Sequence, residues 1–544
     1  MAQSKVDLLI EQRDSIKSGR GNWDNLNQEI SEYLLPRKAE FNRVWAAGEE
    51  RNIELYDSTA VDALNLLASG LHGLMTNPAQ AWIQFTRLRD GEDLSEDAKK
   101  WMDKAVKTIM SVLNSDASGF VPQVHEFYLD ISAFGTGCMY SEPTKEDGRP
   151  DDYLYVKTFS IANVMFAENY RGVVDSVWRT QQMTYRQVAQ EWGEENLHDS
   201  MKRLLKESPD TMAEIMHAVV PREDASRLPG AKTGKEKPFA SYWVDVENKH
   251  LLSESGYDEQ PYNIARWSKS AGELLGRGPG TAALPYIRSL NSMALTAMMA
   301  AEKMADPPLI APDDGFLGPI NSGSGGISYY RSAIPGSSGD MIRPLPVNAD
   351  LPAVQSMIEW RAGQIRGMFL NPQLETFENP NATATQVLAV QAEKMRVLGP
   401  VLGRLQIEFL SPFINRVFGI LLRAGVIEEA PEELQGKELA VEYKNPISSV
   451  QKQAEAQAFL SAVSFVSPVL GAAPNVFDNF DPDEIVRDSQ QIFGYPAKYL
   501  RSVEDRDNSR ARQQQEKQAM TEAALAEKTI SVAGQAKKDG LLDE

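Results

Sequence analysis

The sequence is poor in the residues that most often carry chemistry. One cysteine, Cys138, stands among 544 residues, so neither an intrachain disulfide nor a thiolate metal cluster can form within the chain. This composition fits assembly in a reducing cytoplasm. The histidines are scattered and share no metal-ligand spacing. They are His72, His125, His198, His217 and His250.

Long apolar runs are also missing. No stretch approaches the roughly 20 apolar residues that a membrane-spanning helix requires. The first residues, MAQSKVDLLIEQRDSIKSG, contain no unbroken apolar segment, so we expect no secretory signal. Apolar residues still make up 42% of the chain, which is enough for sizeable cores. Because single cores stop growing near about 300 residues, we expect a soluble protein of several packed units.

The chain has fewer basic than acidic residues. Lysine and arginine number 56 against 76 aspartate and glutamate residues, which gives a formal net charge of −20. Proteins that grip nucleic acid show a basic face, because phosphate neutralisation supplies most of their affinity. Tight general binding of DNA is therefore disfavoured, whereas a surface along which DNA slides remains compatible with this charge.

Two glycine-containing segments resemble phosphate-binding loops but lack the residue spacing that such loops require. In PGAKTGKEK (229–237), Gly230 and Gly234 are one residue too close together, and Glu236 stands where a metal-binding Ser or Thr belongs. GRGPG (276–280) does not match GxGxxG and indicates a backbone bend ahead of a helix. The sequence predicts no enzyme, no cofactor and no metal site.

The segment LYDSTAVDALNLLASGLHGLMTNPAQAW (55–82) predicts a helix that is too apolar for a surface and too polar for a membrane. Ser58 or Thr59 can cap its start. Gly70 and Gly73 have no side chains, so a second face of this helix would let another backbone come close. The alternatives are an ordinary buried core helix and a helix with a second partner.

The first half of the chain mixes helices and strands. Residues 1–36 and 95–141 have helical spacing, and 183–193 forms a helix that Thr184 can cap. The stretch 153–181 alternates like a strand pair and breaks at Asn169/Gly172 as a hairpin does. A further group of strands is predicted within 241–269.

The second half is organised differently. An Ala- and Met-rich helix within 272–304 precedes a Pro/Gly-rich insert (305–345) with short strands, and another helix returns at about 350–370. This order predicts a stalk with a small domain at its tip. A long helix then runs from about 383 to 424, and Pro400 and Pro412 should each bend it.

Five stretches resemble the portal, or head-to-tail connector, proteins of short-tailed bacteriophages. No single one is diagnostic, but their order along the chain is specific. They are LPRKAEFN (35–42) leading into LYDSTAVDALNLLASGL (55–71), NPAQAWIQF (77–85), GVVDSVWRTQQMTYRQVAQEWG (172–193), GELLGRGPGTAALPYIRSLN (272–291) and NATATQVLAVQAEKMRVLGPVLGRLQIEFLSPFINRVF (381–418).

The resemblance implies an α+β, predominantly helical portal fold that assembles into a ring of twelve subunits. The implied parts are a wing (1–270), stem helix 1 (271–304), a clip (305–348), stem helix 2 (349–370), a tunnel loop (371–382), a long wing and crown helix (383–430), a crown (431–500) and a polar tail (501–544). The tail is either a solvated helix or partly disordered.

The resemblance also assigns candidate site residues by region. The tunnel loop would present Asn371, Glu375, Glu378 and Asn379 to the channel. On the stem, Arg288, Lys303, Arg361 and Arg366 would either face the channel or form lateral ion pairs with Glu302 or Glu359. The clip would contact partners through Asp313, Asp314, Tyr329, Tyr330, Arg331 and Arg343.

As a portal at the capsid vertex of a virion, assembled in the host cytoplasm, the ring would pass double-stranded DNA without binding it tightly. It would contact the terminase large subunit, tail adaptor and tail proteins, and the major capsid and scaffolding proteins, but no membrane. Two alternatives remain: another virion ring, such as an adaptor or core protein, and a nuclease that uses scattered carboxylates.

Overall fold

The computed structural model divides the chain into two compact units, residues 1–90 with 102–445 and residues 91–101 with 446–544. Each unit is described by itself. The residues that the structure describes are 2–43, 46, 48–51, 55–87, 95–144, 153–222, 234–312, 321, 323–330, 343–345, 350–374, 396–435, 439–443, 461, 481, 483, 485–486 and 503–538.

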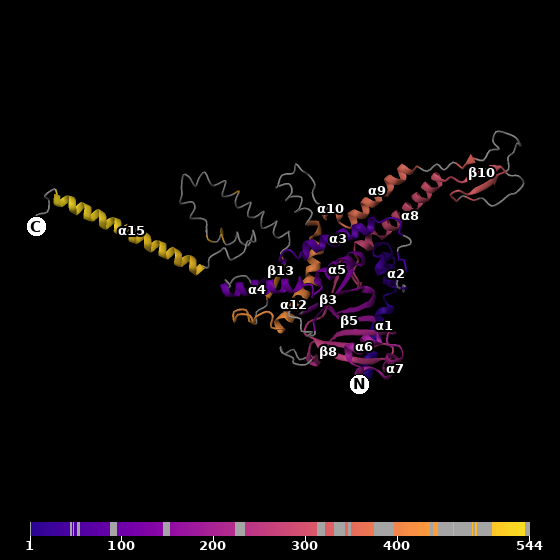
Figure 1. The fold of residues 1–544 in the computed structure, drawn as a ribbon, viewed down its shortest axis with the longest axis horizontal. Coiled ribbons are helices and arrows are strands. Elements are labelled where there is room, and N and C mark those ends of the chain that lie inside the picture. Colours follow the sequence, from indigo (N-terminus) through magenta and orange to yellow (C-terminus); the bar gives the residue numbers. More distant parts are fainter. Residues whose placement is uncertain are drawn as a thin grey trace. The chain divides into compact units, whose positions relative to one another are not determined.

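The first part of this unit is mostly helical (Figure 1). They are α1 (Ala2–Ser18), α2 (Gly21–Leu34), α3 (Thr59–Met75), α4 (Glu96–Leu113, which begins in the second unit) and α5 (Phe120–Phe134). The predicted helix within 55–82 is confirmed as α3, and seven of its side chains are buried. The expected cap is wrong. Ser58 makes no capping bond, and Asp57 instead accepts the amide hydrogen of Thr59 at 2.9 Å.

Two antiparallel sheets lie below α3 and α5 in Figure 1. One has the order β4-β5-β6-β7-β8 and the other the order β3-β2-β9. Their strands are β2 (Thr136–Pro143), β3 (Leu154–Phe159), β4 (Val164–Glu168), β5 (Val174–Thr184), β6 (Met212–Pro221), β7 (Phe239–Asp245), β8 (His250–Tyr257) and β9 (Tyr262–Arg266). Helix α1 covers the larger sheet through Val6 and Leu9.

The turns and helix ends of this region follow local sequence patterns, with one exception. The hairpin at Asn169/Gly172 is confirmed, since Gly172 has a φ of +76° and its amide donates to the Asn169 carbonyl. The capping box of Thr184 with Gln187 is present at α6 (Tyr185–Trp192), and α7 (Asp199–Glu207) follows. The helical prediction for 95–141 is wrong at its end. Gly135, with a φ of +75°, ends α5, and strand β2 follows.

A buried aromatic and polar cluster fills the space between the two sheets. His217 of β6 is fully buried, stacks on Trp243 at 4.0 Å and hydrogen-bonds to the Tyr262 hydroxyl at 2.6 Å. Its other ring nitrogen contacts the Ser241 hydroxyl at 2.9 Å. Burial, helped by the nearby Arg179 guanidinium, holds the pKa of His217 well below its usual range.

The helix Arg396–Arg423 is the longest apolar element of this unit. It contains a π-helical turn, Gln406–Leu410, directly before α12 (Ser411–Arg423). Pro412 has no amide hydrogen for the preceding turn, so the wider turn there agrees with the expected irregularity. Residues 396–405 are helical through Pro400, where the structure shows no interruption.

This helix is long and apolar enough to cross a membrane by length and composition, but half of its most apolar window is buried in the fold. Phe413 is fully buried, and the buried Arg416 donates to the carbonyls of Ser141 (3.0 Å) and Glu259 (2.8 Å). A side chain with these contacts identifies a core helix. Strand β13 (Leu439–Tyr443) then pairs with β1 (Ile83–Arg87).

The second unit is described mainly through α15 (Val503–Lys538), a helix of 36 residues. Arg506 and Arg510, one helical turn apart, both form ion pairs with Asp483. Of the two expectations for the tail, the structure therefore shows the helix. The crown expected at 431–500 lies mostly outside the described residues.

We predict that comparing wild type with His217→Gln at two pH values will show that this buried imidazole is neutral in the folded chain. The unfolded chain gains a proton at His217 below pH 6.5 while the folded chain does not, so stability from this group is lost as the pH falls. The difference in unfolding free energy between wild type and variant should shrink by about 1.4 kcal/mol between pH 7.5 and 5.5. Chemical unfolding at each pH measures it, and a constant difference would contradict the assignment.

Candidate functional site: the root of the projecting helix pair

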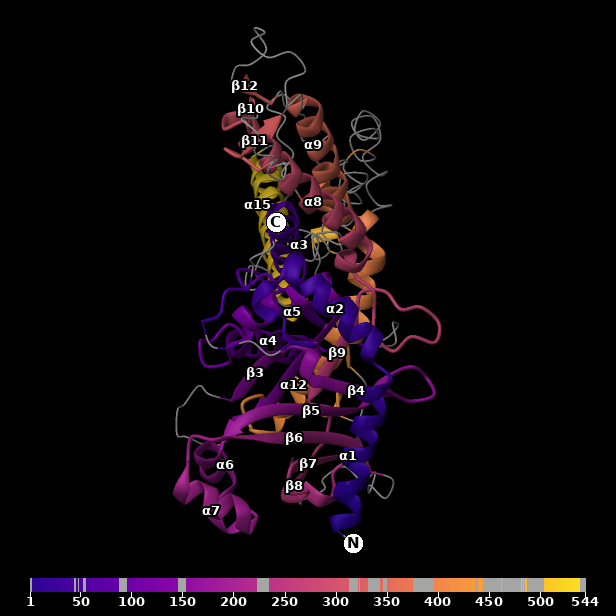
Figure 2. The same cartoon turned by 90° about the vertical axis from the view of Figure 1, so that its right-hand side faces the viewer.

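Two helices leave the body of the first unit side by side and carry a small sheet at their far end (Figure 1, Figure 2). They are α8 (Pro279–Ala305) and α9 (Leu351–Met368). The small sheet has the order β11-β10-β12, with β10 (Leu309–Pro312), β11 (Ile327–Tyr330) and β12 (Arg343–Pro344). Helix, short strands and helix thus follow the order that the sequence predicts.

The first helix of this pair is anchored by direct contact between backbones. A Cβ atom on Gly276 would lie 2.3 Å from the carbonyl oxygen of Gly135, and one on Gly280 would lie 2.3 Å from that of Ala133. The Gly276 amide also donates to the Thr136 hydroxyl at 2.9 Å. GRGPG is therefore the packing surface on which α8 meets the end of α5, and the predicted backbone bend has this cause.

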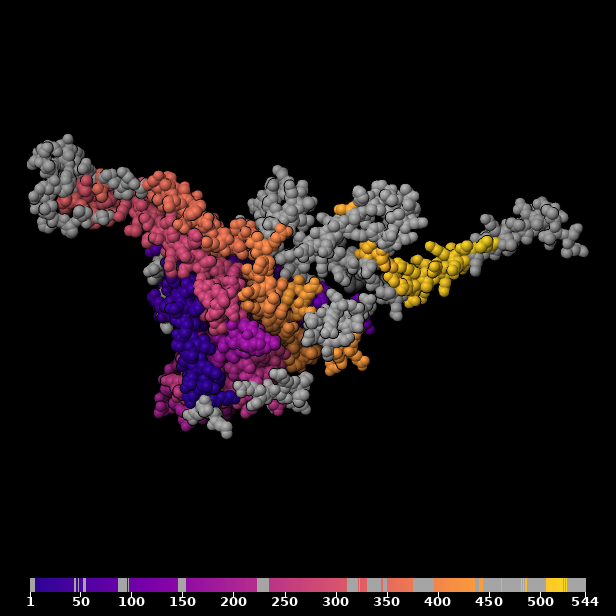
Figure 3. Space-filling model, turned by 180° about the vertical axis from the view of Figure 1, so that it is seen from behind, coloured from indigo at the N-terminus to yellow at the C-terminus, as the bar shows by residue number. Residues whose placement is uncertain are grey.

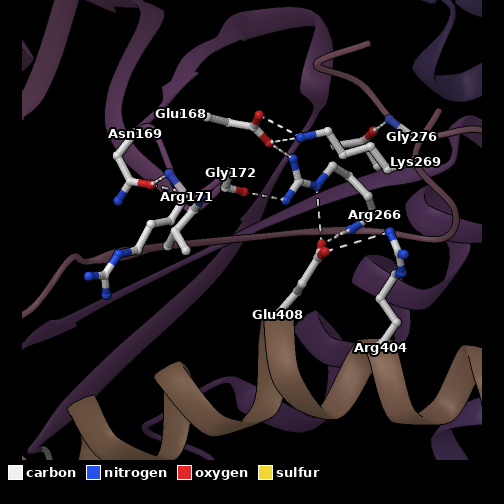
Figure 4. A network of polar contacts seen from close by, with 11 residues as sticks. Glu168, Asn169, Arg171, Gly172, Arg266, Lys269, Gly276, Arg404 and Glu408 are labelled. Carbon is white, nitrogen blue, oxygen red and sulfur yellow. Dashed lines mark hydrogen bonds and ion pairs between the residues drawn. The ribbon is translucent and has the colours of Figure 1, made fainter. Parts of the chain in front are cut away.

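A network of charges joins the same root to other parts of the unit (Figure 4). Arg266, at the end of β9 and 3% exposed, forms an ion pair with Glu168 of β4. It also donates from its amide (3.0 Å) and its Nε (3.1 Å) to Glu408 in the π-helical turn. Lys269 holds the two Glu168 oxygens at 2.7 and 2.5 Å, and Arg404 lies 3.7 Å from Glu408.

The network links three segments that are distant in sequence: the β4–β5 turn, the loop that leads into α8, and the helix Arg396–Arg423. Because Arg266 is buried, removing a single carboxylate would leave an uncompensated charge, which is costly. The Arg266 guanidinium also donates to the Gly172 carbonyl at 3.4 Å, so it binds the backbone of the β4–β5 turn as well. The three segments are therefore positioned together.

The end of α9 is fastened to α3. A Cβ on Gly70 would lie 2.8 Å from both methyl carbons of Leu374, in the short helix α10 (Asn371–Leu374), whereas one on Gly73 would meet nothing within 4 Å. The predicted close approach thus occurs at Gly70, with a side chain instead of a backbone. Leu370, between the helices, has a φ of +57°, a conformation that L-residues adopt at a cost.

The structure places the stem candidates in different surroundings. Arg288 forms an ion pair with Glu29 of α2 within the chain, and the lateral ion pairs expected with Glu302 or Glu359 stay a prediction. Arg361 stacks over Tyr286 of α8 at 5.5 Å and so joins the two helices. Arg366 is exposed and Lys303 half-buried, and the described part of the chain gives neither an ion pair.

The tunnel-loop and clip candidates are only partly described. Asn371 is 3% exposed, and its amide suits the carbonyls of Ala63 and Phe369, each at 3.1 Å. These contacts fasten α10 to α3, and the expectation that Asn371 faces a channel stays a prediction. Tyr329 is exposed on β11, and Tyr330 and Arg343 are described by their backbone. Outside the described residues lie Glu375, Glu378, Asn379, Asp313, Asp314 and Arg331.

Sequence reasoning missed Arg266, Glu168 and Glu408, because no local pattern links residues 98 and 142 positions apart. Among the described residues, no group of three or more His, Cys, Asp or Glu side chains could hold a metal ion. The contacts described for the site are backbone packing at glycines and buried ion pairs. Its geometry is suited to holding a projecting element in place.

Comparison with known proteins agrees with this geometry. The family model described as bacteriophage head to tail connecting protein matches residues 6–500. The chain belongs to this connector family. It is similar to the probable portal protein of Bordetella phage BPP-1, at 28% identity over 88% of this chain and 86% of that protein. It is also similar to the portal protein of Salmonella phage epsilon15, at 28% identity over 98% and 96% of the two chains.

A solved chain from the virion of a native gene transfer agent particle aligns with 86% of the connector and 99% of its own length. The identity is 11% and the TM-score 0.37, so this likeness supports no further conclusion. The sequence relatives place the connector among proteins that join phage head and tail, as the resemblance in the sequence predicts.

We predict that Gly276→Ala destabilises the connector by about 3 kcal/mol or more, because its methyl group would collide with a backbone atom that cannot rotate away. Gly73→Ala is the matched control. Its methyl group enters open space within a helix, so stability should stay equal or rise by up to about 1 kcal/mol. Thermal or urea unfolding of both variants measures this, and equal effects would contradict the packing described for the root.

Proposed function

We propose that this connector forms a closed ring of twelve copies at one capsid vertex of a virion. Residues 1–270 form the wing and 431–500 the crown. Helices α8 and α9 are the stem, residues 305–348 the clip and 371–382 the tunnel loop. Double-stranded DNA passes through the central channel during packaging and again during ejection.

One observation carries the proposal: a connector-family chain holds a rigidly rooted helix pair away from its body, with a small sheet at the tip. A ring requires each copy to present two different faces to its neighbours, with a rotation that closes. A projecting pair repeated around such an axis forms a tube. The glycine contacts and the charge network fix the direction of the pair in every copy.

The charge of the chain suits passage of DNA. Twelve copies at −20 each give a formal −240 (12 × 20). An acidic bore repels phosphate, and every phosphate contact that is avoided removes one point at which moving DNA could be held. Exposed cations such as Arg366 would steady the duplex at a few levels.

The tip of the helix pair would be the surface on which other proteins dock. The clip would meet the terminase large subunit first and tail adaptor proteins later, through residues such as Tyr329 on β11. Tyr329 is 47% exposed, as an aromatic contact residue needs to be. The ATPase that drives packaging would be a separate protein, because none of the sequence motifs of this chain fits a nucleotide.

Lateral contact between stems is supported by exposed apolar side chains on both helices. Trp360 of α9 is 59% exposed, and the open positions Gly363 and Gly367 follow it at helical spacing on the same face of the helix. Exposed methionines accompany it: Met357 on α9, and Met298, Met299 and Met304 on α8. Such a surface on a projecting element marks a contact with another chain.

We predict that Trp360→Glu prevents ring formation while leaving the monomer folded. A buried, unpaired carboxylate at each of twelve contacts would oppose closure, whereas Trp360→Phe keeps an apolar ring and should still assemble. Sedimentation velocity separates rings from monomers, and circular dichroism checks the fold. Rings of unchanged size and stability with Trp360→Glu would remove α9 from the subunit interface.

A further inference from the structure

The turn between β4 and β5 carries the most exposed large apolar side chain in the described part of the chain. Tyr170 is 89% exposed, and Val173 beside it is 58% exposed. Figure 2 shows the turn extending from the edge of the larger sheet, with the loop that leads into α8 beside it. In Figure 3 the magenta region of these strands reaches the surface next to the orange helix Arg396–Arg423.

The turn is rigid although it is exposed. The Asn169 carboxamide oxygen accepts from the amides of Arg171 (2.9 Å) and Val173 (3.2 Å), and the Asn169 amide donates to the Val173 carbonyl at 2.9 Å. From behind, Arg266 holds the Gly172 carbonyl (Figure 4). A preorganised loop loses little conformational entropy when it binds, so its contacts contribute fully to affinity.

The two side chains at the tip are the types that dominate protein interfaces. Arg171 donates from Nε to the Tyr170 hydroxyl at 2.6 Å, which fixes both side chains. The terminal amino groups of Arg171 have no partner among the described residues, and Figure 4 shows this guanidinium pointing away from the network. A free guanidinium fork beside an exposed tyrosine is suited to a carboxylate next to an apolar surface.

The surroundings of the turn are cationic in an acidic chain. Four cations, Arg171, Arg266, Lys269 and Arg404, lie in the turn and the network around it, against the three carboxylates of Glu168, Glu408 and Asp175. Asp175 also accepts a hydrogen bond from the Ser176 hydroxyl at 2.9 Å. With a net charge of −20, the remaining surface of each copy is strongly acidic and complements this turn.

We propose that the 169–173 turn is a docking finger that inserts Tyr170 and Arg171 into an acidic, partly apolar surface of a second copy of this chain. This proposal rests on the proposed ring. The charge network then gains a role, because it ties the finger to the helix Arg396–Arg423 and to the root of α8. A contact between the finger and a neighbouring copy would thus be connected, through the charge network, to the elements that position the stem.

The test places the photoreactive analogue p-benzoylphenylalanine at position 170 of the full-length chain and irradiates assembled rings. We expect a cross-link between two copies, mapped by mass spectrometry to a segment rich in Asp and Glu. We also expect Tyr170→Ala to raise the midpoint concentration for assembly about tenfold or more. Tyr155→Ala removes another exposed tyrosine, on β3, and should leave the midpoint unchanged.

The outcomes separate the two proposals. If wild-type protein forms no rings, the proposed function fails and the finger with it. If rings form but irradiation joins position 170 to no second copy, or only to a capsid or tail protein when these are present, the docking finger is overturned while the ring stands. An assembly midpoint for Tyr170→Ala equal to that of wild type would overturn it as well.

Discussion

The contact between two glycine-containing backbones at the root of α8 constrains the rest of this structure. The carbonyls of Ala133 and Gly135 occupy the space that side chains on Gly280 and Gly276 would need. Atoms of a backbone cannot change rotamer to relieve a clash, so the helix that starts at Pro279 has one position relative to α5. The partner helix α9 then follows α8 through packing and the stacked Arg361. A projecting element without its own core gains a defined direction in this way.

Buried charge adds a second level of positioning. Hydrophobic burial alone is non-directional, whereas the guanidinium of Arg266 needs acceptors at fixed angles. Its two carboxylate partners come from β4 and from the π-helical turn, so the network specifies how the larger sheet and the helix Arg396–Arg423 meet. The cost of leaving any of these charges unpaired favours one arrangement over alternatives of similar compactness.

The sequence predicts the elements of this fold well where a local pattern sets them. The helix pair, the hairpin at Asn169 and the cap at Thr184 depend on residues a few positions apart, which periodicity and turn chemistry describe. The glycine run at 276–280 signals a bend, but its partner at 133–136 lies about 140 residues earlier. For the same reason the pairing of Arg266 with Glu408 could not be predicted. Asn371 likewise lies against Ala63 of α3, which is far from it in the sequence.

The central claim is that identical copies with rigidly rooted helix pairs close around a hollow axis. Electron cryomicroscopy of the purified full-length protein tests it most directly. We expect particles with rotational symmetry and a central opening wide enough for a DNA duplex. Helices α8 and α9 of every copy should form the wall of this opening. Particles without rotational symmetry, or rings whose helix pairs point away from the opening, would contradict it.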